Sequence, residues 1–199
     1  GVFAGLRPLV SSDPDSPTTD LSREHVVDHP VPGFVSIAGG KYTTYRVMAQ
    51  DAVDEATNDL RRIVPESCTH KVAIIGADGY SVMMNKVAEL SREYGVTQQT
   101  IEHLLHRYGS LFEEVLEIGT LDHTLLHRVA ENLPYLKAEI RYAVSHEGAL
   151  SVDDVLSRRT RIAFESSDQG LGIVTTVAEI IAPVLGWNEI EKRLSIDDY

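Results

Sequence analysis

Cysteine is almost absent from this sequence, and no apolar run is long enough to cross a membrane. The single cysteine, Cys68, has no partner for an internal disulfide, which is typical of a chain that works in a reducing compartment such as the cytoplasm. The most apolar stretch, residues 170–187, is interrupted by Glu179 and Pro183, whereas a membrane helix needs about 20 mostly apolar residues. The sequence therefore predicts no transmembrane span.

Basic residues are scarce as well. Lysine and arginine number 18 against 30 acidic residues, which gives a formal net charge of -12. A chain this acidic is repelled by nucleic-acid phosphates and by anionic lipid, so we expect neither as a general partner. With 43% hydrophobic residues, the 199-residue chain can still bury a core, and its length fits one large domain or two small ones.

The glycine fingerprint of dinucleotide-binding folds, Gly-x-Gly-x-x-Gly after a strand, is also missing. Residues 74–79 imitate it only superficially, because their glycine spacing differs and no glycine-started helix follows. The sequence begins at Gly1 and not at methionine, which suggests an excised piece or a processed product, with a tag remnant as the alternative. We therefore expect that the pyrophosphate and adenosine sites of any dinucleotide lie outside this chain.

The first third of the sequence predicts strands followed by one helix. Residues 24–27 and 34–37 are rich in β-branched side chains and are separated by a loop with two prolines and a glycine, which favours an antiparallel hairpin. From Thr43 the apolar residues follow a helical period, and this helix should end at Val64 because Pro65 disfavours helical geometry in the residue before it.

The remainder of the sequence predicts an all-α domain over 83–199, joined by a linker at 65–82. Residues typical of helix N-caps and glycines typical of helix ends punctuate it. The predicted helices are 83–94, 97–108, 110–118, 122–147, 151–166, 168–186 and 188–195. The fold class is therefore α+β, with a small antiparallel β part followed by an all-α carboxy-terminal domain.

One motif, residues 35–46, predicts a strand, a Gly-Gly turn and a helix start. Gly39 and Gly40 let the backbone approach a ligand closely, and the helix N-terminus offers free N–H groups to an anion. Lys41 adds a full positive charge, and the helix could be capped, or a ligand bound, by either threonine, Thr43 or Thr44. The alternative is that the glycines only turn the chain and that Thr43 is an ordinary cap; the spacing alone does not decide between them.

Five blocks of sequence occur here in the order found in the FAD-dependent glycerol-3-phosphate dehydrogenases. These blocks are residues 4–9, 21–27, 38–46, 133–142 and 157–164. The chain resembles the carboxy-terminal part of this family over most of its length, in both halves. Where the family usually has leucine or tryptophan, this chain has Tyr42, which keeps a large side chain in that place. The resemblance implies that residues 1–64 are the end of an FAD- and substrate-binding domain.

The same resemblance implies a role for single residues. Arg7 and Arg23 resemble basic residues that hold the substrate phosphate, and Lys41 resembles a lysine beside flavin and substrate; without the resemblance, both arginines would be interpreted as surface or ion-paired residues. The flavin-contacting turn would comprise Gly39, Gly40, Lys41, Tyr42, Thr43 and Thr44. The family's presumed catalytic base is a histidine in the upstream part, so we expect no catalytic residue among the eight histidines here.

For the intact protein, the resemblance implies a membrane-associated flavoenzyme of glycerol metabolism. It would oxidise sn-glycerol 3-phosphate to dihydroxyacetone phosphate with FAD, pass electrons to quinone, and lie in the cytoplasm at the inner face of the cell membrane. The chain alone is expected to be inactive and not to bind FAD. Two alternatives stay open: a glycerol-3-phosphate oxidase, which gives its electrons to oxygen, and a freestanding helical binding module.

Other clusters of polar residues carry weaker hypotheses. The pairs His103 and His106, and His123 and His127, have helical spacing, but a zinc site needs a third ligand, so we expect no metal. Three arginines lie close together in an acidic chain, and such a cluster usually pairs with carboxylates; they are Arg158, Arg159 and Arg161. We expect Glu139 to pair with Arg158 or Arg159.

The strands near 1–6, 23–28 and 34–38 raise a further expectation. Separated from the sheet of an intact domain, they would expose unpaired backbone groups and apolar side chains. We expect them to pair with one another and with a second copy of the chain, which would give a non-physiological homodimer. The alternative is that they fold back onto the helical domain.

Overall fold

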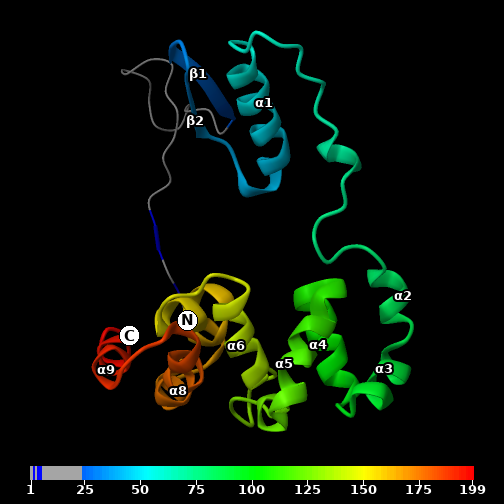
Figure 1. Cartoon of the computed structure of the whole chain (residues 1–199), viewed down its shortest axis with the longest axis vertical. Coiled ribbons are helices and arrows are strands. Elements are labelled where there is room, and N and C mark those ends of the chain that lie inside the picture. Colours follow the sequence, from blue (N-terminus) through cyan, green and yellow to red (C-terminus); the bar gives the residue numbers. More distant parts are fainter. Residues whose placement is uncertain (1, 3, 6–23) are drawn as a thin grey trace. The chain divides into compact units, whose positions relative to one another are not determined.

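The structure, a computed structural model, describes residues 2, 4, 5 and 24–199 (Figure 1). The chain divides into two compact units at Ala73 and Ile74, inside the segment 65–82 that was predicted as a linker. We call residues 24–73 the hairpin unit and residues 74–199 the helical unit, and each is described by itself.

The hairpin unit begins with two antiparallel strands, β1 (His25–Val31) and β2 (Phe34–Gly39), as the sequence predicted. Their pairing runs from His25 opposite Gly39 to Val31 opposite Phe34 and is irregular between Asp28 and Val31. Pro30 lies in this interval and has no N–H to contribute to a ladder, which accounts for the irregularity. The strand expected near 1–6 lies largely outside the described residues.

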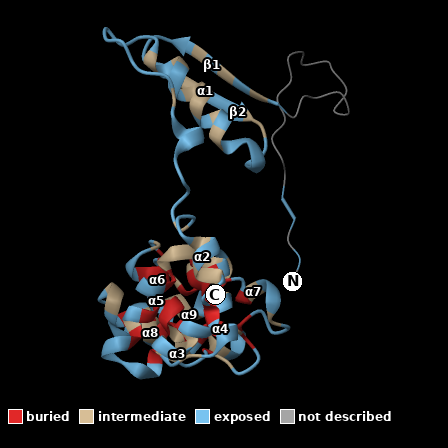
Figure 2. Cartoon of the chain, turned by 90° about the vertical axis from the view of Figure 1, so that its right-hand side faces the viewer, coloured by how far each residue is buried: buried red, intermediate tan, exposed pale blue. Residues whose placement is uncertain are grey.

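Helix α1 (Tyr45–Thr57) lies against the hairpin (Figure 1). It ends at Thr57 and not at Val64 as predicted; the Thr57 hydroxyl donates to the carbonyl oxygen of Asp54 at 3.0 Å, and the N–H of Leu60 donates to the carbonyl of Thr57. Within residues 24–73 no side chain is fully buried (Figure 2). One helix on one hairpin is therefore too small to enclose a core.

The helical unit has two hydrophobic clusters, and the first is built by its amino-terminal helices. These are α2 (Tyr80–Met84), α3 (Val87–Tyr94), α4 (Gln98–Tyr108) and α5 (Phe112–Leu121). The cluster buries apolar residues that recur with helical spacing, among them Ile101, Leu104, Leu105, Phe112 and Val115. The predicted helix 97–108 and its cap are confirmed, since the side chain of Thr97 accepts a hydrogen bond from the N–H of Thr100.

The second cluster is built by the carboxy-terminal helices. These are α6 (Lys137–Ser145), the π-helix η6 (Asp154–Arg159), α7 (Ile162–Glu165), α8 (Val174–Leu185) and α9 (Glu189–Asp197). Its fully buried members include Ile140, Val155, Leu156, Ile162, Val177 and Ile181. Among the described residues no helix is both long and apolar enough to span a bilayer.

The long helix predicted over 122–147 is wrong. The chain forms a short 3-10 helix, η5 (His123–Leu126), and then runs without helix to Leu136, where an isolated bridge pairs Arg128 with Leu136. Pro134 explains the interruption, because proline lacks an N–H and disfavours helical geometry in the residue before it. Helix α6 begins only at Lys137, where the Glu139 carboxylate accepts from the N–H of Leu136 at 2.7 Å.

Two other predicted helices are each divided in the structure. The span 83–94 contains the end of α2 and all of α3, and the span 151–166 breaks at Thr160 between η6 and α7. The Thr160 hydroxyl is buried and donates to the carbonyl oxygen of Val155 at 2.7 Å, so it competes with the helical ladder at the break.

Candidate functional site

The Gly-Gly turn after β2 adopts a backbone that favours glycine. Gly39 and Gly40 both have φ of 78°, in the left-handed region. A Cβ at Gly40 would lie 2.5 Å from Met48 Sδ and 3.2 Å from His25 Cβ, so this backbone also approaches its neighbours closely. The turn therefore favours glycine at both positions, and Gly40 also allows the close contact with Met48 of α1.

After this turn the chain presents free backbone donors. Lys41 is extended, and residues Tyr42–Thr44 form the 3-10 helix η2 that leads into α1. The N–H groups of Lys41, Tyr42 and Thr43 donate to no residue that the structure describes. Thr44 is the first residue after the turn whose N–H donates, and its acceptor is the carbonyl oxygen of Lys41. Three adjacent donors and an exposed lysine make this segment suited to an anion.

The predicted capping role of the threonines is not what the structure shows. Thr44 occupies the N-cap position of α1, but its side chain accepts no cap hydrogen bond and instead donates to the carbonyl oxygen of Lys41 at 2.9 Å. Thr43 lies inside η2. The donors of this turn are therefore its backbone N–H groups.

Beside the turn is a mostly apolar hollow of about 460 Å³. It lies between β2 and α1 and is lined by Ile37, Gly39, Gly40, Lys41, Tyr45 and Met48. A flat ring system with an anionic edge would place its apolar face on these side chains and its edge on the N–H groups. The residues of the turn therefore fit the flavin that the resemblance implies. Arg7 and Arg23, the two predicted phosphate ligands, lie outside the described residues.

Two histidines that sequence reasoning did not single out fix α1 to the hairpin. His25 Nε2 lies 2.7 Å from Asp51 Oδ2, and His29 lies 3.0 Å from both Glu55 Oε1 and Asp59 Oδ2. The Asp59 carboxylate also accepts from the N–H of Gly33 at 2.9 Å. Asp51 and Glu55 lie four residues apart on α1, and Asp59 follows four residues later, beyond the helix end; that spacing is the signal that could have revealed the contact.

The hydrogen bond from His29 to Glu55, helped by the charge of Asp59, raises the pKa of His29 above its ordinary value. A raised folded-state pKa means that this contact stabilises the hairpin unit fully below about pH 6.5, the pKa of unfolded histidine, and less as pH rises through the folded-state pKa.

We expect amide hydrogen exchange in α1 to accelerate with rising pH by more than the intrinsic exchange rate does, because the contact of His29 with α1 weakens. His29→Gln should remove this additional acceleration. His70→Gln, at an exposed position, is the matched control; an unchanged additional acceleration in H29Q would contradict this assignment.

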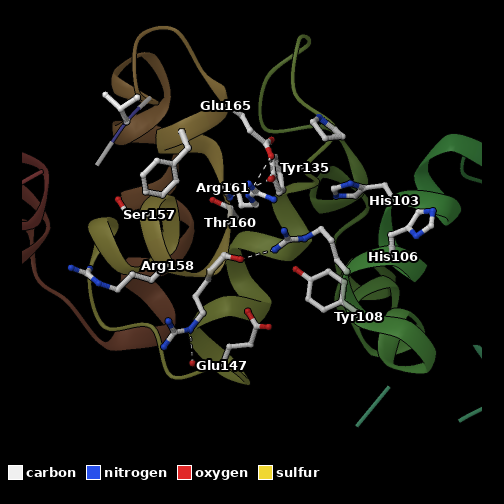
Figure 3. Close-up of a pocket in the computed structure, with 15 residues that line it drawn as sticks. His103, His106, Tyr108, Tyr135, Glu147, Ser157, Arg158, Thr160, Arg161 and Glu165 are labelled. Carbon is white, nitrogen blue, oxygen red and sulfur yellow. Dashed lines mark hydrogen bonds and ion pairs between the residues drawn. The ribbon is translucent and has the colours of Figure 1, made fainter. Parts of the chain in front are cut away.

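The helical unit contains a second site, an open pocket of about 1030 Å³ (Figure 3). Arginines from α4, from the end of η6 and from the break after η6 line it together with tyrosine and glutamate side chains. The predicted cluster of three arginines is thus gathered on one pocket. Figure 3 shows Tyr108, Tyr135, Glu147, Arg158 and Arg161 among its lining residues.

The predicted ion pair between Glu139 and Arg158 or Arg159 is wrong. Glu139 is fully buried and its carboxylate lies 3.0 Å from both Arg107 Nε and His103 Nε2. Arg158 pairs with Asp153 and Asp154 near its own helix. Arg159 donates from Nε to the carbonyl oxygen of Glu147 at 2.8 Å. The partners of Glu139 come from α4, and one of them, Arg107, also donates to the carbonyl oxygen of Arg159.

The Glu139 cluster closes one wall of the pocket. The Tyr108 hydroxyl also donates to Glu139, at 3.2 Å, and burial beside this carboxylate raises the pKa of Tyr108 well above its ordinary range. The Arg107 guanidinium lies 5.3 Å from the ring centre of Tyr108 and 5.0 Å from that of Tyr135. A buried carboxylate with this many donors holds α4 and α6 in register.

The histidine pair on α4 contacts side chains of other helices. Within the described part of the chain, no three histidine, cysteine, aspartate or glutamate side chains are grouped to hold a metal ion. His103 bonds Glu139, and His106 bonds the hydroxyl of Tyr80 at 3.0 Å. Both members of this pair therefore link helices.

Comparison with known proteins gives consistent matches. Residues 67–192 match the family model described as the C-terminal domain of alpha-glycerophosphate oxidase. Over 199 residues the chain is 45% identical to glycerol-3-phosphate dehydrogenase 2 of Mycobacterium tuberculosis. This match covers 100% of the present chain and 34% of the Mycobacterium protein. It is 31% identical over 199 residues to the mitochondrial glycerol-3-phosphate dehydrogenase of Mus musculus, covering 98% of this chain and 27% of that protein.

A solved structure shares the fold. It is the glycerol-3-phosphate dehydrogenase from Bacillus halodurans complexed with FAD, with a TM-score of 0.71 at 23% identity. The match covers 89% of this chain and 36% of the Bacillus chain. The present chain thus spans about a third of the length of the curated relatives it matches.

Proposed function

Because the chain belongs to the family of the C-terminal domain of alpha-glycerophosphate oxidase, we propose that it is part of an FAD-dependent glycerol-3-phosphate dehydrogenase. The observation that carries the proposal is the 45% identity over 199 residues with the Mycobacterium tuberculosis enzyme. The chain covers 34% of that relative, so the activity is a property of the whole protein. Other parts of that protein would supply the dinucleotide fingerprint and the catalytic histidine.

In this proposal the hairpin unit supplies one edge of the active site. The chemistry that FAD would supply there is acceptance of a hydride. The C2–H of sn-glycerol 3-phosphate would leave as that hydride and the proton of the C2 hydroxyl would pass to the catalytic histidine, which gives dihydroxyacetone phosphate. The N–H groups of Lys41, Tyr42 and Thr43 and the ammonium of Lys41 would stabilise the negative charge that the reduced flavin carries. Arg7 and Arg23 would hold the substrate phosphate, since a guanidinium meets two phosphate oxygens at once.

The exposed apolar residues of the hairpin unit support its place in a larger domain. Val31 and Phe34 are each 56% exposed, and Val26 is 45% exposed, although such side chains are normally covered. The rest of an FAD domain would cover them. In the isolated chain we propose that the strands near 1–6, 23–28 and 34–38 pair with one another and with a second copy of the chain. Sedimentation velocity tests for that homodimer.

We propose quinone as the electron acceptor and a position at the inner face of the cell membrane. An oxidase, which would give its electrons to oxygen, is the second candidate, because the matching family model is named after alpha-glycerophosphate oxidase. Steady-state oxidation of glycerol 3-phosphate by the intact protein distinguishes them. A dehydrogenase turns over with a soluble quinone and only slowly with oxygen, whereas an oxidase produces hydrogen peroxide at a comparable rate. Turnover with neither acceptor would instead favour the freestanding binding module.

The 199-residue chain alone is expected not to bind FAD. Contacts along the whole length of a dinucleotide contribute to its affinity, and the chain has no fingerprint for the pyrophosphate. Isothermal titration of the purified chain with FAD should therefore release no saturable heat. Binding in the micromolar range would show that the turn at Gly39 and Gly40 suffices, which is contrary to this account.

A further inference from the structure

The pocket of the helical unit gathers four arginines on an acidic chain. Four arginines and two glutamates line it: Arg107, Arg158, Arg159, Arg161, Glu147 and Glu165. The chain as a whole has a formal net charge of -12. An arginine in a concave site can bind an anion only through the N–H donors that its carboxylate or carbonyl partners leave unused, so each arginine is considered in turn.

Arg107 is held rigidly with part of its guanidinium unused. Its Nε donates to Glu139 at 3.0 Å and its Nη2 to the carbonyl oxygen of Arg159 at 2.6 Å, and two tyrosine rings flank it. Nη1 donates to no described residue. A ligand that bound there would not have to order a flexible side chain, which reduces the entropic cost of binding.

Arg159 completes a pair with Arg107. Its Nε is fixed on the carbonyl oxygen of Glu147 at 2.8 Å, while neither of its terminal nitrogens donates to any residue that the structure describes. The Arg107 contact with the Arg159 carbonyl joins the backbone of one arginine to the side chain of the other. Two fixed guanidinium groups with unused N–H donors match the oxygens of a tetrahedral oxyanion.

The other charged groups of the lining are arranged differently. Arg158 is already neutralised by Asp153 and Asp154, and Arg161 is 73% exposed with Glu165 at 3.8 Å. Glu147 Oε2 is buried and has no hydrogen-bond partner, and burial raises the pKa of this carboxyl. Glu147 thus opposes an anion when it is ionised, and its removal should help one to bind.

We propose that this pocket binds an oxyanion of the phosphate class, held by Arg107 and Arg159. The proposal concerns residues of the helical unit alone, and it does not depend on the proposed function. A free phosphorylated molecule and a phospholipid headgroup offer the same chemistry, and the experiment separates these two sources.

The test uses the 199-residue chain labelled with nitrogen-15 and titrated with inorganic phosphate at constant ionic strength. We expect saturable shifts of the Nε–H signals of Arg107 and Arg159. Arg159→Gln should weaken binding by about tenfold or more, because charge-assisted contacts are lost. Glu147→Gln should tighten binding, and Arg193→Gln, which alters an exposed arginine of α9, should leave it unchanged.

A parallel arm measures cosedimentation with phosphatidylcholine vesicles that contain phosphatidylglycerol, compared with phosphatidylcholine alone. Saturation by inorganic phosphate identifies a free phosphate ligand, and vesicle binding that R159Q removes identifies a headgroup. The proposal is overturned if neither probe binds saturably, or if R159Q and R193Q respond alike. Because R159Q could disturb the fold, the opposite effect expected of E147Q gives an independent test: equal or weaker binding in E147Q also contradicts the proposal.

Discussion

Replacing Glu139 by alanine is expected to destabilise the helical unit by about 3–5 kcal/mol, the usual cost of removing one partner of a buried ion pair. The carboxylate is fully buried and accepts hydrogen bonds from Arg107, His103, Tyr108 and the N–H of Leu136. Its loss leaves the Arg107 charge without its partner and uncaps α6. No other single side chain described here joins α4 and α6 through so many donors.

Urea unfolding followed by tryptophan fluorescence measures this effect. The sole tryptophan, Trp187, packs against the second core cluster, so its signal reports the helical unit alone. Glu189→Ala is the control, because Glu189 is largely exposed and pairs with Lys192 at the surface, where such pairs contribute under about 1 kcal/mol. Equal unfolding free energies for E139A and E189A would show that the buried cluster does not hold the helices together.

Replacing Gly109 by alanine is expected to cost about 3 kcal/mol or more. Gly109 has φ of 58° and ψ of -133°, and a Cβ there would lie 1.9 Å from the carbonyl oxygen of Gly76. The obstructing atom belongs to the backbone, so it cannot move aside as a flexible side chain would. The substitution adds backbone strain to overpacking and breaks the hydrogen bond from the N–H of Ser110 to Gly76.

A second glycine separates backbone strain from overpacking. Gly95 ends α3 with φ of 67°, but a Cβ there would meet no atom within 4 Å. Gly95→Ala should therefore cost only about 1–2 kcal/mol, the penalty of the left-handed conformation. Unfolding free energies from the same urea titration decide the matter, and a loss in G109A no greater than in G95A would mean that the contact with Gly76 relaxes freely.

Local signals in the sequence predicted much of this fold. Two segments rich in β-branched residues predicted the hairpin. Gly95 and Thr97 end α3 and cap α4, in agreement with the predicted helices 83–94 and 97–108. Each of these features depends on residues within a few positions of one another. Gly119 lies one residue beyond the predicted helix 110–118 but is inside α5, where a Cβ would meet Leu126 at 2.3 Å; close packing and not chain reversal explains this glycine.

Contacts distant in sequence were beyond the reach of such signals. Glu139 pairs with Arg107, 32 residues away, and the choice between Arg107 and Arg159 depends on how helices pack. The contacts of His25 and His29 with α1 likewise span 26 residues. Pro134 was the one local signal that was overlooked, and it would have divided the helix predicted over 122–147. The turn at 39–44, by contrast, was found from sequence because its glycines and helix start are consecutive.

If this chain supplies substrate contacts to a glycerol-3-phosphate dehydrogenase, replacing Arg7 by alanine should impair the intact protein in its use of the substrate. Loss of a bidentate phosphate contact costs about 2–3 kcal/mol, so kcat/KM for glycerol 3-phosphate should fall roughly thirtyfold to hundredfold while flavin content stays normal. Arg92→Ala, at an exposed position of α3, should leave kcat/KM unchanged. An unchanged kcat/KM in R7A with full flavin loading would contradict the account.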